Sequence, residues 1–310
     1  MTRSHYILKA HGIPGLCRYY TSLLLYTAYR RIQEERNAAR YRRAGPAPID
    51  TQLFTGSPFH LPSGDAGIGV ELMSGIREPN ATRYLATLLR NDDVILDIGA
   101  NIGYYVAVER HFAPGASIHA IEPVPANLAL LRQNAPSGVT IHPVAISDHT
   151  GTDPIYIPDH CNWATLNRQH AGTLAGVYTE QVPVTTLDRF CEEHDLAPTF
   201  LRMDVEGSEA AILKGASNLI ASGQPLKMMI ELHALSRPPG EIETMVRDLL
   251  RVGFVIRRVI AEPNIKMGNG TKPLRRWYDI LWNSLPGDTF DRLAYLMRDG
   301  FSPNVFLERR

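Results

Sequence analysis

The residues best placed to do chemistry lie in the stretch VILDIGANIGYYVAV, residues 94–108, where an apolar run ends in an acid and two glycines. Asp97 follows the run, and Gly99, Asn101 and Gly103 come directly after it. Glycine lets the backbone turn sharply and lets a ligand approach closely, while the first turn of a helix offers free N–H groups. We therefore expect a ligand to lie over this turn.

Polar residues also follow four later apolar runs, at the points where those runs end. They are Glu122, Ser147 with Asp148, Asp204 with Glu206, and Glu231 with His233. In open parallel sheets, ligands bind beyond the carboxyl ends of the strands. The pattern therefore predicts that these side chains meet at one edge of a sheet.

The glycine spacing separates two kinds of nucleotide cofactor. A dinucleotide site uses GxGxxG, whose N–H groups hold a pyrophosphate, whereas Asn101 stands here where the second glycine would be. Asp97 is a poor neighbour for a pyrophosphate and a good one for a cofactor that carries an ammonium and a sulfonium. Glu122 is placed to accept both hydroxyls of a ribose, a feature that nicotinamide sites share.

The elements that must position these residues alternate along the chain. Apolar runs typical of strands cover 94–96, 117–123, 139–147, 199–207, 226–233, 254–260 and 304–310. Amphipathic runs typical of helices cover 78–90, 104–112, 126–135, 208–222 and 240–253. Strands that alternate with helices of this length predict a doubly wound, mostly parallel α/β sheet with right-handed crossovers.

Four further stretches lie outside this alternation. Residues 44–69 are rich in Pro and Gly and predict a linker into short strands, while 71–76 predict an edge strand. Residues 148–198 predict an extra hairpin and a short helix, and 261–303 predict an insertion before the last strand. Insertions of this kind commonly shape specificity, because loops carry function on a fixed scaffold.

Composition sets the broad class of the protein. The 310 residues are 44% hydrophobic and 21% charged, with a formal net charge of zero. These values suit one large or two small globular domains and give no sign of nucleic-acid binding. Three cysteines without a CxxC pair are typical of a reducing compartment, so a cytoplasmic protein is expected. No apolar stretch reaches the length of about 20 residues that spans a bilayer.

Five motifs carry a resemblance to a known family. DIGANIGYY, AIEPVPAN, PVAISD, TTLDRF and RMDVEGSEAAILKGA occur in the order seen in FkbM-type methyltransferases, which use S-adenosylmethionine on the class I, Rossmann-like methyltransferase fold. The chain resembles this family over about residues 78–260 and in NVFLERR, and the combination of DIGANIG with DVEGSE is the most specific part. The resemblance implies the same fold, with an antiparallel last strand, and O-methylation of a hydroxyl on a small molecule or glycan.

The resemblance also implies roles for individual residues around the cofactor, S-adenosylmethionine. The turn 97–103 matches the loop that holds the methionine part of the cofactor, and Glu122 matches the ribose ligand. Ser147 and Asp148 match the contacts on the adenine side. Together these residues predict a cofactor site built from the ends of three strands.

The resemblance places Asp204 and Glu206 beside the transferring methyl group and the acceptor, with Asp204 also near the cofactor. Methyl transfer needs alignment of donor and acceptor and a base for the hydroxyl proton. We expect Asp204 and Glu206 to orient the acceptor and His233, whose ordinary pKa is about 6.5, to be the base. These residues and Glu231 could also bind a divalent metal, but their spacing carries no metal signature, so no metal is predicted.

Residues 1–50 are expected to be a basic extension of a methyltransferase domain that covers 51–310. Residues 1–45 hold nine Arg or Lys against two Glu, and an amphipathic helix is expected from about Gly15 to Tyr41. Such a helix binds an anionic membrane surface, or it packs on its own domain or on a second copy of the chain. The sequence leaves these alternatives and the oligomeric state open.

Two other functions compete with methyl transfer to a small-molecule or glycan acceptor. One is a nicotinamide-dependent oxidoreductase, against which the GxxxG spacing and the DVEG motif argue. The other is a non-catalytic binding protein on the same fold, against which the full set of acids at the strand ends argues. Cofactor binding and group transfer are the properties that separate the three.

Overall fold

The computed structural model describes residues 49–62, 68–158, 163–172, 174, 176–233, 240–260 and 302–310. It also describes 8, 12–18, 20–21, 24, 32, 35–41 and 43 near the N-terminus, and residues 290 and 293. Most of the predicted insertion at 261–303 and much of the N-terminal extension therefore lie outside the described residues.

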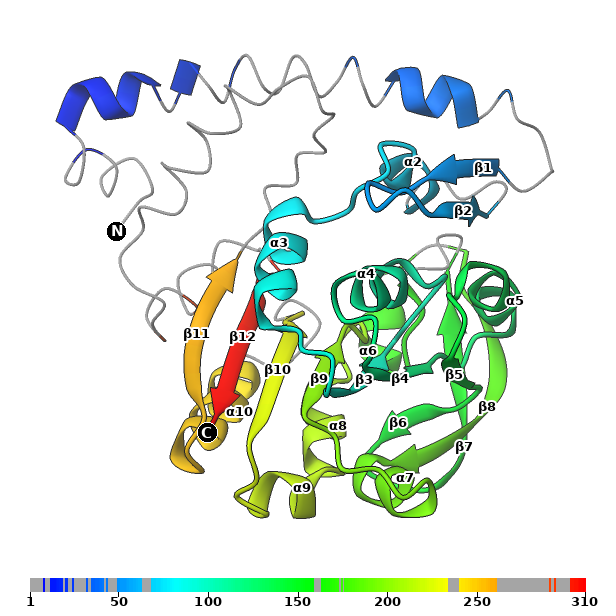
Figure 1. Cartoon of the computed structure of the whole chain (residues 1–310), viewed down its shortest axis with the longest axis vertical. Coiled ribbons are helices and arrows are strands. Elements are labelled where there is room, and N and C mark those ends of the chain that lie inside the picture. The colour runs from blue at the N-terminus through cyan, green and yellow to red at the C-terminus, as the bar shows by residue number, and fades with distance from the viewer. Residues whose placement is uncertain are drawn as a thin grey trace.

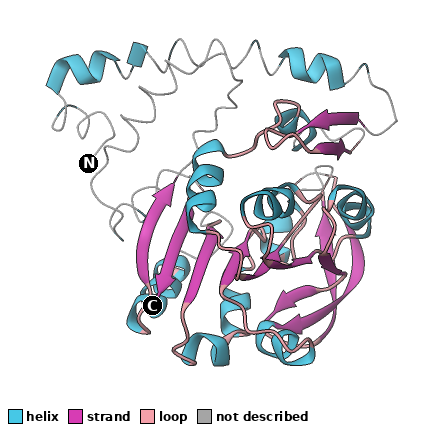
Figure 2. Cartoon of the chain, viewed as in Figure 1, coloured by secondary structure: helices cyan, strands magenta, loops and turns pink. Residues whose placement is uncertain are grey.

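Seven strands form the central sheet (Figures 1 and 2). They are β3 (Val94–Ile98), β4 (Ser117–Ile121), β5 (Val139–His142), β9 (Phe200–Met203), β10 (Leu226–Glu231), β11 (Val255–Ile260) and β12 (Asn304–Arg309). Their order across the sheet is β11-β12-β10-β9-β3-β4-β5. The pairs from β10 to β5 are parallel, and β12 runs antiparallel to both β10 and β11. This confirms the predicted doubly wound sheet with an antiparallel last strand.

Helices cover both faces of the sheet (Figure 1). They are α3 (Pro79–Leu88), α4 (Tyr104–Phe112) and α5 (Pro125–Asn134) on one side, and α7 (Leu187–Glu193), α8 (Glu209–Lys214), α9 (Ser217–Ala221) and α10 (Glu241–Arg251) on the other. Because side chains alternate along a strand, Ile95 joins a core with Leu85 and Leu131, while Leu96 joins a second core with Ile212. Each fully buried aliphatic side chain contributes roughly 1.5–3 kcal/mol.

The strand predicted over 139–147 is divided between two sheets. Its first part is β5 of the central sheet, and its last part belongs to a second, three-stranded sheet. The chain leaves the main sheet after β5, passes Pro143, which has no N–H to donate, and forms β6 (Ala145–Ser147). This strand pairs in parallel with β8 (Tyr178–Thr186), which pairs antiparallel with β7 (Gly151–Ile157). The predicted hairpin and short helix are therefore confirmed as β7, β8 and α7, with α6 (Arg168–Ala171) between the two strands in sequence.

Two other expectations need correction. The single helix predicted over 208–222 is divided into α8 and α9 at Gly215, whose carbonyl oxygen accepts the N–H of Asp188 at 3.0 Å. The edge strand predicted over 71–76 is wrong, since the chain there forms α2 (Ile68–Leu72) and a turn. Its buried residues Ile68 and Leu72 lie one helical turn apart, and Gly75 follows in the left-handed region at φ 75°.

Part of the described chain before α2 packs on the domain, through the buried side chains of Tyr41, Leu53, Phe59 and Leu61. The predicted short strands are confirmed as the hairpin of β1 (Ile49–Gln52) and β2 (Pro58–Leu61). Residues 12–18 and 35–41 are helical, and the Tyr41 ring is buried against Gly69. The rest of the predicted helix over 15–41 lies outside the described residues, and its membrane contact stays a prediction. Within the described parts of the chain, no helix is both long and apolar enough to cross a membrane.

Candidate active site

The turn between β3 and α4 is held in a conformation that its glycines allow. Gly99, Asn101 and Gly103 have φ angles of 79°, 52° and 93°, all in the left-handed region that favours glycine. The N–H groups of Gly99 and Ala100 donate to the carbonyl oxygen of Ile121, at 2.9 and 3.0 Å. A Cβ on Gly99 would lie 2.1 Å from the backbone oxygen of Asp204. The turn is therefore packed directly on the carboxyl ends of β4 and β9.

Glu122 comes directly after β4 and is buried, with 4% of the residue exposed. Its Oε2 accepts the N–H of Asn101 at 2.9 Å, and its Oε1 accepts the N–H of Val124 at 2.9 Å and the Asn127 side chain at 3.2 Å. Burial raises the pKa of Glu122 to about 7, although the hydrogen bonds act to lower it. This carboxyl therefore exchanges its proton near neutral pH.

A cleft brings several of the predicted residues together. Its empty volume is about 580 Å³, open solvent at the mouth included. The predicted residues that line it are Gly99, Asn101, Glu122, Asp204 and Glu206. Apolar side chains that sequence reasoning missed, among them Val124, Ile146, Leu166 and Val205, form other parts of its wall.

Asp97 lies behind the cleft rather than in its wall. It is fully buried within β3, and Arg202 of β9 donates from Nη1 to its Oδ1 at 2.9 Å. Arg202 also donates to the carbonyl oxygen of Gly99 at 3.1 Å, and from Nη2 to Oδ2 of Asp204 at 2.8 Å. Burial raises the pKa of Asp97, whereas Arg202 and Arg77 hold the pKa of Asp204 below its usual value despite burial. Asp97 thus positions the turn and Asp204 through Arg202.

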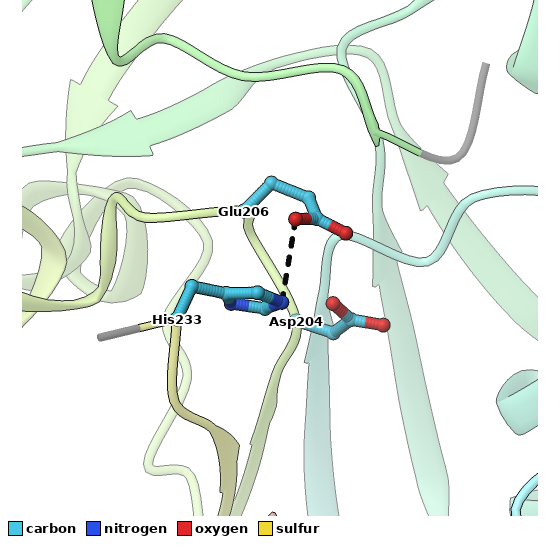
Figure 3. Close-up of side chains that lie close together, drawn as sticks. All are labelled: Asp204, Glu206 and His233. Atoms are coloured by element: carbon cyan, nitrogen blue, oxygen red, sulfur yellow. Dashed lines mark ion pairs between the residues drawn. The ribbon is translucent and has the colours of Figure 1, made fainter. Parts of the chain in front are cut away.

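Asp204, Glu206 and His233, here called the acceptor cluster, lie close together beyond β9 and β10 (Figure 3). One ligand atom of each lies within 4.8 Å of those of the other two. His233 Nε2 is 3.3 Å from Oε2 of Glu206, and its Nδ1 is 2.6 Å from Oε1 of Glu209. The structure therefore joins the three residues that were predicted to act on the acceptor.

The charge on His233 follows from its neighbours. Burial opposes the charge, but the carboxylates of Glu206, Glu209 and Glu231 together raise the pKa of His233 well above its usual value. Burial also raises the pKa of Glu206 to about 7. These carboxylates favour the protonated ring of His233, and its role as the base stays a prediction.

Several residues around the acceptor cluster had no role in the sequence-based hypothesis. Glu209 is fully buried and also accepts the N–H of Gly207 at 3.2 Å. Arg77 lies 3.7 Å from Oδ2 of Asp204 and 3.1 Å from Glu78. Arg202 had a usable signal, since a charged side chain inside an apolar strand needs a buried partner. Arg77 had none, because it lies outside the predicted strands and far from Asp204 in the chain.

Besides Asp97, three predicted cofactor residues lie apart from the described wall of the cleft. A Cβ on Gly103, just before α4, would meet the Leu131 side chain at 2.9 Å. Ser147 is buried at the end of β6, and Asp148 is paired with Lys214 at 2.6 Å and His149 at 3.0 Å. Their predicted contacts with a cofactor therefore stay predictions.

Comparisons with known proteins agree with this architecture. The chain matches the FkbM methyltransferase domain over residues 97–256. It is 28% identical to the 31-O-demethyl-FK506 methyltransferase FkbM of Streptomyces tacrolimicus, with 51% of this chain and 72% of the relative covered. It is also 28% identical to the hexuronic acid methyltransferase AglP of Haloferax volcanii, with 51% and 63% covered, so it spans under two thirds of that relative.

Among solved structures, the methyltransferase FkbM of Methylobacillus flagellatus KT is 23% identical with a TM-score of 0.38, covering 55% of this chain and 41% of that one. The sheet of the present chain, with β12 antiparallel among parallel strands, is the class I methyltransferase sheet. The FkbM domain covers half of the chain and includes the glycine turn, Glu122 and Asp204. The chain belongs to the FkbM methyltransferase domain family.

Proposed function

We propose that this protein transfers a methyl group from S-adenosylmethionine to a hydroxyl oxygen of a small molecule or sugar. One observation carries the proposal: the glycine turn, Glu122, Asp204 and Glu206 line one cleft at the carboxyl ends of β3, β4 and β9. The curated relatives support the acceptor class, because one is named for a 31-O-demethyl substrate and the other for a hexuronic acid.

The cleft fits the cofactor in three respects. Gly99 leaves room where a side chain would collide with the Asp204 backbone. The Glu122 carboxylate is buried in the wall, and its Oε2, which accepts one N–H among the bonds described, has a second lone pair for a ribose hydroxyl. Val124 and Ile146 offer apolar surface for a flat ring. S-adenosylmethionine supplies a methyl group that its sulfonium already activates.

The residues of the chain then have to align the acceptor. Asp204 and Glu206 accept hydrogen bonds from the acceptor hydroxyl and hold its oxygen in line with the methyl group, which is worth several kcal/mol in general. Arg202 keeps Asp204 ionised by donating to its Oδ2 at 2.8 Å. His233 completes the acceptor cluster, held by Glu209 on its far side.

Titration calorimetry with S-adenosylhomocysteine, followed by transfer of labelled methyl to a panel of hydroxylated sugars and small molecules, tests the proposal. We expect saturable binding by the intact chain and transfer that Glu206→Gln lowers at least tenfold. Glu193→Gln is the matched control, because Glu193 is half exposed and pairs only with Arg189 among the described residues. It should behave as the unmodified chain does.

Two results would overturn the proposal. Binding of NADH with no binding of S-adenosylhomocysteine would favour the oxidoreductase. Binding of S-adenosylhomocysteine without transfer to any member of the panel would favour a non-catalytic protein.

A further inference from the structure

The acceptor cluster has the composition and spacing of a metal site. It offers two carboxylates and one imidazole, and one ligand atom of each lies within 4.8 Å of the others (Figure 3). Divalent cations bind oxygen ligands at about 2.0–2.6 Å, so two ligands on opposite sides of one cation are about 4–5 Å apart. The three side chains can therefore reach a common cation with small adjustments.

His233 is oriented as a ligand would be. Its side chain is 8% exposed, and Nδ1 lies 2.6 Å from the fully buried carboxylate of Glu209, which leaves Nε2 turned toward Glu206. Metal-bound histidines almost always donate their second ring N–H to a carboxylate, carbonyl or water in this way. The contact with Glu209 comes from outside the three ligands and fixes which nitrogen faces them.

The surroundings carry more negative than positive charge. Glu206, Glu209 and Glu231 lie 3.3, 2.6 and 3.8 Å from the ring of His233, which can offset one of them. Oε2 of Glu231 and Oε2 of Glu209 are buried and have no hydrogen-bond partner among the described residues. Buried carboxylates without a partner are costly, so this arrangement favours a cation close by.

The two arginines near Asp204 leave room for such a cation. Arg202 and Arg77 both approach Oδ2, at 2.8 and 3.7 Å, while Oδ1 enters neither contact. Each guanidinium is also shared, since Arg202 binds Asp97 and Arg77 binds Glu78. Other acids therefore already offset the positive charge of the two arginines. The excess negative charge of the carboxylates around His233 is not neutralised by them.

We propose that Asp204, Glu206 and His233 hold a divalent cation of the Mn²⁺ or Mg²⁺ kind, which binds the acceptor hydroxyl. The cation site stands on the three side chains alone, whereas its role toward the hydroxyl rests on the proposed methyl transfer. A divalent cation lowers the pKa of an oxygen that it binds and orients it.

The transfer then balances as follows. The hydroxyl proton leaves to solvent, and the oxygen forms a bond to the methyl carbon. The carbon–sulfur bond breaks, and its electron pair stays on sulfur, which gives the methyl ether and S-adenosylhomocysteine. No oxidant or reductant is needed.

Calorimetric titration of the EDTA-treated, desalted full chain with MnCl₂, with and without S-adenosylhomocysteine, tests the proposal. We expect one site per chain, weakened at least tenfold in Glu206→Gln and in Asp204→Asn. Glu209→Gln should weaken it as well, since the loss of such an outer carboxylate typically costs about 10- to 100-fold in affinity. Glu193→Gln should leave it unchanged, and a cooperative urea-unfolding transition shows that each variant is folded.

Two results would refute the proposed cation site. One is no saturable Mn²⁺ binding by a chain that binds S-adenosylhomocysteine; the other is the same affinity in Glu206→Gln as in the unmodified chain. Methyl transfer that EDTA leaves undiminished would also remove it, while the proposed function would stand. Mn²⁺ binding that depends on Glu206 without any S-adenosylhomocysteine binding would keep the cation and remove the proposed function.

Discussion

Glu122 should make cofactor affinity depend on pH. Its carboxyl is buried in the wall of the cleft, and burial raises its pKa to about 7. Ribose hydroxyls donate hydrogen bonds most strongly to the ionised carboxylate. S-adenosylhomocysteine should therefore bind the ionised form, and binding should strengthen as the pH rises.

The magnitude follows from the ionised fraction. With a pKa of about 7, the carboxyl is about 90% protonated at pH 6 and about 90% ionised at pH 8. If only the ionised form binds, the Kd falls about tenfold between these values, or about 1.4 kcal/mol. Glu122→Gln should weaken binding at pH 8 by about 10- to 150-fold, because hydrogen bonds to a charged group contribute about 1.5–3 kcal/mol.

The same shift has the opposite effect on the ligand-free protein. Burial raises the pKa of Glu122 from 4.5 to about 7, so between these values the folded chain holds a proton that the unfolded chain has released. The free energy of unfolding should therefore fall by about 3 kcal/mol as the pH rises through this window. Urea unfolding at pH 5 and pH 8 measures this loss.

Calorimetric titration with S-adenosylhomocysteine at pH 6, 7 and 8 measures the affinity. Glu206 also has a pKa of about 7, so the slope alone does not identify the group, and Glu122→Gln is needed to assign it. A Kd that is flat in the unmodified chain would refute the reasoning, as would a slope that Glu122→Gln retains.

Two further predictions concern the support of the site. Gly99→Ala should abolish S-adenosylhomocysteine binding in calorimetry and destabilise the chain to urea by more than about 1–2 kcal/mol, because φ is 79° and the Cβ would lie 2.1 Å from the Asp204 oxygen; a variant with native affinity would contradict this. Arg202→Met should cost about 3–5 kcal/mol in urea unfolding, because Asp97 is then buried without its partner. A loss below about 1 kcal/mol would show that Asp97 does not depend on Arg202.

The sequence predicted the main sheet and its site better than it predicted the local structure at Gly215 and over residues 71–76. Periodicity and strand-end acids are local signals, so the order of strands and helices and the cleft residues Gly99, Asn101, Glu122, Asp204 and Glu206 were found. The break at Gly215 was not predicted, because the contacts of this residue are with Ser147 and Asp188, which lie far away in the chain. The wrong strand over 71–76 has the same origin, since burial on the domain decided its conformation.

The sequence by itself determined the fold class, the turn that faces the cleft and the acids that follow the strands, because each depends on residues that are neighbours in the chain. Only the tertiary structure determined the partners and the pKa of those acids. It turned Asp97 from the cleft toward Arg202, set Glu209 against His233, and surrounded His233 with carboxylates that raise its pKa. The physical reason is that pKa and pairing depend on burial and on distances between segments up to about a hundred residues apart, which spacing along the chain does not encode.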